Sequence, residues 1–125
     1  MNKIYEDADI WIERENSPIP WIKIFTKEPF RELSDCPAPL RHKLFETAMT
    51  AERAMRDYFR PTKINHASFG NYVARVHLHV MARFENDTHF PEPMWGEKQR
   101  EWVPDLPDFD GFAAELKKKL EKEVS

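Results

Sequence analysis

Two histidines, His77 and His79, are the residues of this chain best suited to act together on one substrate. They stand two positions apart in the segment RVHLHVMARF, residues 75–84. Side chains two apart on a β-strand point to the same face, so an extended segment here places both imidazoles together, with Cα atoms roughly 6.5–7 Å apart. Near neutral pH an imidazole can act as a nucleophile, as a general base or as a metal ligand.

The residues around the two histidines alternate between apolar and polar types. One face of the predicted strand is apolar and carries Val76, Leu78, Val80 and Ala82. The other face carries Arg75, His77, His79, Met81 and Arg83. This alternation predicts a strand that is buried on one side and presents two imidazoles and two guanidiniums on the other.

A zinc site is an alternative use of the same histidines, because imidazole is a common zinc ligand. Further ligands would have to come from His89 or from a carboxylate, and no spacing supports either choice. The single cysteine, Cys36, excludes a cysteine-based zinc site and a disulfide framework. We therefore expect that no cofactor is required and keep zinc as the less favoured alternative.

Other strands must flank the histidine strand. Residues 10–13 (IWIE) and 21–26 (WIKIFT) are rich in β-forming residues, and prolines 18 and 20 mark a turn between them. This pattern predicts a hairpin, preceded by a short strand at residues 4–5. Alternation places Trp21, Lys23 and Phe25 on one face of the second hairpin strand. Residues 63–71 predict a further strand that runs into a loop.

Two helices complete the predicted elements. Apolar residues recur at three- and four-residue steps from residue 40 to residue 58, which predicts a long amphipathic helix. Asp35 is the expected N-cap, Pro37 or Pro39 is expected in the first turn, and Pro61 ends the helix. A short helix is expected at about residues 108–123.

These elements predict an α+β fold: an antiparallel sheet of about five strands, one long helix and a short C-terminal helix. Residues 1–125 are expected to form a single domain. The net charge of −3 argues against non-specific binding to nucleic acid. An acidic N-terminus and the lack of an apolar run near ~20 residues argue against a signal peptide and a membrane span, so we expect a cytoplasmic protein.

The segment from Asn65 to Gly96, NHASFGNYVARVHLHVMARFENDTHFPEPMWG, resembles the signature region of the histidine-triad (HIT) superfamily. It is most similar to a bacterial hydrolase branch, like the diadenosine polyphosphate hydrolases, that has a GN dipeptide, the histidine strand and a proline-rich tail ending in Trp-Gly. Upstream, IPWIKIF and RPTKIN stand where that branch has counterparts, so the resemblance covers residues 4–96. It implies a HIT-like fold and a homodimer with a continuous sheet.

The resemblance also implies an activity. Family members are nucleotide hydrolases or nucleotidyl transferases that act on adenosine dinucleotide polyphosphates or nucleoside phosphoramidates. By position, His77 would attack the α-phosphorus and form a nucleotidyl-histidine intermediate, which water then resolves. His79 would lie near the leaving group. A purine nucleotide is therefore the expected partner, with no role for nucleic acid or a membrane.

Further site residues follow from the same resemblance. Asn71 matches a family position whose amide contacts phosphate, and Asn65 matches a polar position lining the nucleotide site. Gly70 would let the backbone approach the ligand closely. His89 and Trp95 lie in the segment that folds near the site or the dimer interface, where they could stack on a base. Ile10, Trp11, Ile22, Ile24 and Phe25 are placed around the nucleoside by approximate position only.

Arg75 departs from the family pattern, because it occupies the position of the first triad histidine. A guanidinium there could favour the neutral form of His77 or clamp a phosphate. Alternatively, the exchange breaks the hydrogen-bond network and leaves a nucleotide-binding protein with weakened or absent catalysis. A third possibility is that Arg75 pairs with an acidic neighbour and has only a structural role. Ala82 also replaces the proline usual in this branch.

Overall fold

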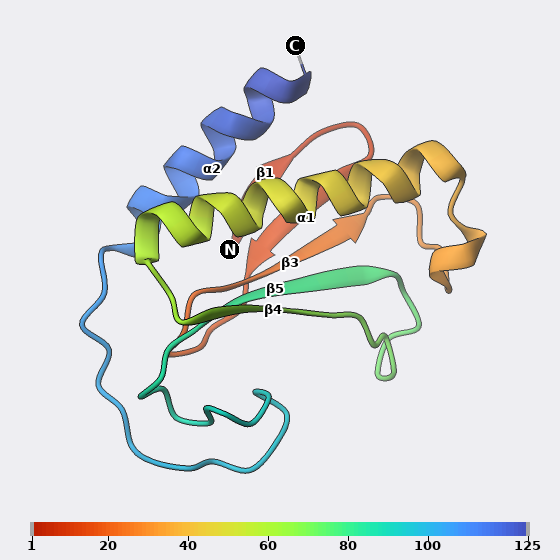
Figure 1. Ribbon diagram of the computed structural model, residues 1–125. Coiled ribbons are helices and arrows are strands. Elements are labelled where there is room, and N and C mark those ends of the chain that lie inside the picture. The colour runs from red at the N-terminus through yellow and green to blue at the C-terminus, as the bar shows by residue number, and fades with distance from the viewer. Residues whose placement is uncertain (1, 125) are drawn as a thin grey trace.

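The computed structural model describes residues 2–124, which form a five-stranded antiparallel sheet with two helices on one face (Figure 1). The strands are β1 (Lys3–Glu6), β2 (Ile10–Arg14), β3 (Trp21–Thr26), β4 (Lys63–Ala67) and β5 (His77–Arg83). Their order in the sheet is β1-β2-β3-β5-β4, so the histidine strand lies between β3 and β4. The predicted fold class and the β2–β3 hairpin are confirmed.

The helices α1 (Ala38–Phe59) and α2 (Phe109–Val124) cover one face of the sheet, and a short 3-10 helix, η1 (Leu33–Asp35), precedes α1. The core lies between this face and the helices. Its fully buried members include Ile22 and Ile24 of β3, Val80 and Ala82 of β5, Ala51 and Met55 of α1, and Phe112 and Leu116 of α2. Each large apolar side chain removed from water here contributes about 1.5–3 kcal/mol.

The start of α1 differs from the prediction. The N-cap is Pro37, whereas Asp35 ends η1, where its carboxylate accepts the backbone N–H of Glu32 at 3.2 Å. Asp35 therefore caps the shorter helix, because two residues, Cys36 and Pro37, separate it from α1. The end of α1 is as predicted: the helix stops at Phe59, and Arg60 takes a left-handed conformation with φ of 53° before Pro61.

The segment between β5 and α2, residues 84–108, has no helix or strand and runs across the side of the sheet away from α1 (Figure 1). It therefore lies on the face to which β5 directs its histidines. Between residues 2 and 124, no helix is both long and apolar enough to cross a membrane.

Candidate active site

The pairing of β3 with β5 builds the site. Phe25 lies opposite His77, and Lys23 lies opposite His79. Opposed residues of an antiparallel pair point to the same face, so the histidines and the side chains of Trp21, Lys23 and Phe25 share the face away from α1. The two imidazole rings lie 4.9 Å apart between centroids. The predicted placement of His77 and His79 side by side is thus what the structure contains.

His77 is held by the backbone that leads into its strand. Its Nδ1 lies 2.9 Å from the carbonyl oxygen of Arg75. A carbonyl only accepts hydrogen bonds, so Nδ1 carries the proton. The neutral ring then has its lone pair on Nε2. The Phe25 ring stacks on the imidazole at 5.0 Å and an angle of 23°, which fixes the ring plane.

At His79 the hydrogen bond runs in the opposite direction, with Nδ1 as the acceptor. The indole Nε1 of Trp21, which can only donate, lies 2.9 Å from Nδ1 of His79. Nδ1 is therefore the acceptor, and the neutral ring carries its proton on Nε2. Burial lowers the pKa of His79 to about 4, and the nearby His77 and Lys23 act in the same direction. At neutral pH His79 is an uncharged hydrogen-bond donor.

Arg75 turns away from the histidine rings. Its Nη2 donates to the carbonyl oxygens of Thr26 at 2.7 Å and Lys27 at 2.8 Å, and its guanidinium lies 4.8 Å from the centre of the Trp11 ring. The side chain thus ties residue 75 to the end of β3. Because the carbonyl of Arg75 orients His77, this attachment holds the acceptor of the His77 proton in place.

The three remaining predicted residues occupy different surroundings. Asn65 accepts a hydrogen bond from Nη1 of Arg83 at 2.8 Å, so its amide oxygen is engaged away from the histidines. Gly70 has a φ of +72°, and a Cβ there would meet the Arg75 carbonyl at 3.3 Å. This requirement explains the glycine in the β4–β5 loop. Asn71 is exposed in the same loop.

An aromatic enclosure around His79, formed by Trp21, Phe69 and Trp95, is the main feature that the sequence did not predict as a unit. Ring centroids lie 5.7, 6.2 and 5.0 Å from the imidazole, respectively. The expectation that Trp95 lies near the site is met. The alternation of β3 placed Trp21 on the correct face, but only the register of β3 against β5 brings it to His79.

Arg83, which shares a face with the histidines, forms a buried ion pair with Asp87, with Nε 2.9 Å from Oδ2. Asp87 also accepts backbone N–H groups of Phe84, His89 and Phe90. Burial would raise the pKa of Asp87, but these hydrogen bonds, that from Arg83 above all, outweigh it and hold the pKa below its usual range. The pair anchors the segment that carries Trp95.

The structure brings no group of three or more potential metal-binding His, Cys, Asp or Glu side chains together within residues 2–124. His89, the histidine considered as a third zinc ligand, has its Nδ1 2.7 Å from the hydroxyl of Thr88. A fourth histidine, His66, contacts Glu52 of α1 at 2.7 Å, on the other face of the sheet.

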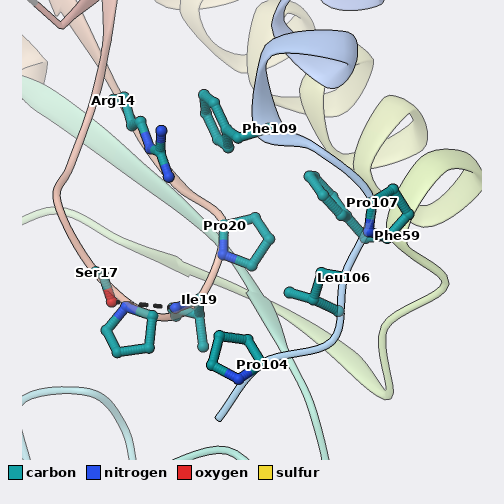
Figure 2. Close-up of a pocket in the computed structure, with 10 residues that line it drawn as sticks. Arg14, Ser17, Ile19, Pro20, Phe59, Pro104, Leu106, Pro107 and Phe109 are labelled. Carbon is teal, nitrogen blue, oxygen red and sulfur yellow. Dashed lines mark hydrogen bonds between the residues drawn. The ribbon is translucent and has the colours of Figure 1, made fainter.

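The expected nucleoside wall divides between the two faces. Ile10, Ile22 and Ile24 are buried in the core beneath α1. Trp11 and Phe25 are on the histidine face, where their rings stack at 4.8 Å. A separate cavity of about 160 Å³ lies where β2 ends and α2 begins. Figure 2 shows the residues that line it. Its lining includes Arg14, Pro20, Phe59 and Phe109 and none of the predicted site residues.

Comparison with known families gives one match: the HIT domain, over residues 1–86. No match was found among curated protein sequences.

Several solved structures share the fold. A histidine triad protein from Bradyrhizobium japonicum is 24% identical, with a TM-score of 0.77 over 94% of this chain and 88% of that one. One from Sinorhizobium meliloti is 27% identical, with a TM-score of 0.74 over 93% and 87% of the two chains. A Sulfolobus tokodaii protein described as a hypothetical histidine triad nucleotide-binding protein is 13% identical, with a TM-score of 0.59 over 98% and 83%.

Proposed function

Because the chain belongs to the HIT domain family, we propose that it binds a purine nucleotide and hydrolyses or transfers its nucleotidyl group through His77. The observation that carries this proposal is the hydrogen bond from Nδ1 of His77 to the Arg75 carbonyl. It holds the proton on the nitrogen facing the strand and leaves the Nε2 lone pair free for attack.

The proposed reaction has two displacements. In the first, the Nε2 lone pair of His77 forms a bond to the α-phosphorus while the bond to the bridging oxygen or nitrogen breaks, and the leaving group takes a proton from solvent water. In the second, water attacks the same phosphorus, the phosphorus–nitrogen bond breaks, and one proton is released. An alcohol or amine in place of water would give transfer. Covalent catalysis divides one difficult displacement into two easier ones.

His79 supplies a hydrogen-bond donor next to the nucleophile. Its Nε2–H can stabilise the negative charge that develops on a phosphoryl oxygen or on the leaving atom. A donor held in a largely buried position is more effective than water, because it needs no reorganisation during the reaction. The two imidazoles thus offer a lone pair and a proton side by side.

The substrates we propose are an adenosine dinucleotide polyphosphate or an adenosine phosphoramidate. Support for nucleotide binding comes from the family and from the Sulfolobus relative, which is described as nucleotide-binding. The exposed loop with Gly70 and Asn71 is our candidate for phosphate contacts. Asn65 and Arg75 contribute by holding Arg83 and the His77 acceptor, respectively, since both side chains are already hydrogen-bonded.

A nucleotide-binding protein without catalysis is the second candidate. The observation in its favour is that the guanidinium at the first triad position binds the carbonyls of Thr26 and Lys27 rather than facing the two histidines. In that case nucleotide binding would persist, and no covalent intermediate would form.

A single-turnover assay with both substrates separates these candidates. Wild-type protein is expected to form an acid-labile nucleotidyl adduct, and His77→Ala is expected to lower its formation at least about a thousandfold. His66→Ala is the matched control, because His66 lies on the other face and pairs with Glu52. It should retain wild-type activity.

The outcomes are distinct. An adduct that disappears only in His77→Ala supports the hydrolase or transferase. No adduct, but a nucleotide-dependent rise in melting temperature, supports the binding protein. Neither turnover nor stabilisation would overturn both.

A further inference from the structure

The two histidines, two residues apart, have their Nδ1 atoms bound to groups of opposite character. The partner of His77 is a carbonyl oxygen, which accepts, whereas the partner of His79 is an indole N–H, which donates. Since each Nδ1 can either donate or accept, these partners decide where the proton of each neutral ring resides. The two imidazoles therefore differ in which nitrogen carries the proton, and for His79 this is determined by Trp21 on the neighbouring strand β3.

We infer that Trp21 is a positioning residue that holds the proton of neutral His79 on Nε2, and that it thereby makes His79 the donor of the site. This inference rests on the proposed function for its catalytic consequence only. The position of the proton is a property of the free protein and can be measured without a substrate.

The geometry of Trp21 supports a specific role beyond packing. Its Nε1 lies 2.9 Å from Nδ1 of His79, and the two rings meet edge to face with centroids 5.7 Å apart at an angle of 64°. Trp21 begins β3 and lies diagonally across from His79, with β3 and β5 paired along their length. The rigid sheet therefore fixes the donor, and rotation of the His79 ring would leave the partly buried indole N–H without this partner.

The same hydrogen bond also opposes protonation of His79. A second proton on the ring would have to enter at Nδ1, where the Trp21 N–H already points, so the indole bond would have to break. Among the charged groups that act on His79, Lys23 disfavours a further positive charge and Glu15 favours it more weakly. Lys23 is itself held by Glu13 and Glu15 at 3.8 and 2.9 Å. His79 thus stays neutral at neutral pH.

Trp95 provides a matched control. Its ring meets the His79 imidazole edge to face at 5.0 Å, close to the distance for Trp21. Trp95→Phe thus removes an indole from the same enclosure without removing the hydrogen bond to Nδ1. If enclosure alone determined the state of His79, then Trp21→Phe and Trp95→Phe would change it equally.

The test is nitrogen-15 NMR of the histidine side chains in the free wild-type protein and in both variants. In wild-type protein at neutral pH we expect His79 to carry its proton on Nε2 and His77 on Nδ1. Trp21→Phe is expected to mix the two forms of neutral His79 and to move its titration up towards the ordinary range, whereas Trp95→Phe leaves the protonated nitrogen unchanged. The single-turnover rate of Trp21→Phe should fall about tenfold with little change in KM.

Two results would overturn the inference. One is a wild-type spectrum with the His79 proton on Nδ1, which needs no variant and so does not depend on Trp21→Phe folding. The other is a Trp21→Phe protein whose His79 keeps the wild-type shifts and titration. If wild-type protein shows the expected proton positions but no turnover, the proposed function fails while the role of Trp21 in setting the proton stands.

Discussion

The two ends of β5 use the same face of the same strand in different ways. At its start, His77 and His79 lie among aromatic rings and each keeps one nitrogen available. At its end, Arg83 is 1% exposed, and its guanidinium is engaged by Asp87, Asn65 and the Glu92 carbonyl. The alternation that placed both ends on one open face was therefore correct about the shared face, but it did not predict that Arg83 is buried. A reactive side chain needs a polar atom that is not already hydrogen-bonded, whereas in an anchoring side chain such as Arg83 every nitrogen forms a hydrogen bond.

The Arg83–Asp87 pair, called the anchor below, helps to position the residues around the histidines. The Arg83–Asp87 pair and the backbone bonds to Asp87 begin the segment that brings Trp95 against His79, and Arg100 extends the same network by donating to the Asp87 and Phe90 carbonyls. The comparison predicts that changes at the anchor affect stability first, and that changes near the histidines affect chemistry first.

Asp87→Ala should have the largest effect on stability. It leaves the Arg83 guanidinium buried without a counter-charge, which typically costs about 3–5 kcal/mol of unfolding free energy. Chemical denaturation is the measurement. Asp105→Ala, at an exposed position of the same segment, is the control and should change stability by less than about 0.5 kcal/mol. A similar loss in both variants would mean that Asp87 contributes no specific anchor.

Arg75→Met, which changes the residue two positions before the start of β5, should have an intermediate effect. It removes the hydrogen bonds to Thr26 and Lys27, and we expect a loss of about 1–3 kcal/mol, together with a slower single-turnover reaction because the acceptor of His77 is less well held. Arg75→Lys tests whether charge alone suffices. A lysine cannot reproduce the planar arrangement of donors, so it should restore little. Full rescue by lysine would instead favour a role for the charge.

Acid should produce the smallest of the three effects. The folded pKa of Asp87 is lowered, so its contribution to stability is present above the unfolded value of about 3.9 and is lost as the pH falls through the folded pKa. Unfolding free energy should therefore decline more steeply below about pH 4 in wild-type protein than in Asp87→Asn. Equal slopes would show that the carboxylate is not stabilised in the folded state.

Much of the fold was predictable because its signals are local. The alternation in residues 75–84 identified β5 and its two faces, the prolines at 18 and 20 identified the hairpin turn, and Pro61 marked the end of α1. Asp35 was misassigned because a capping residue can serve either of two adjacent helices, and the choice depends on where each helix begins. The sequence also showed that Arg75 occupies the position of the first triad histidine. It did not show that the Arg75 side chain points to the carbonyls of Thr26 and Lys27.

The sequence by itself determined that two imidazoles share one open face of a central strand, because a strand repeats every two residues. Only the tertiary structure decided the partner of His79 Nδ1, because the partner of His77 Nδ1 lies two residues away in the chain. The acceptor for His77 is a backbone carbonyl, which every residue carries, and the donor to His79 comes from residue 21, far away in the sequence. Sequence periodicity specifies the face on which a side chain lies, but strand register and loop path specify its neighbours. Those neighbours determine which nitrogen of a histidine carries the proton.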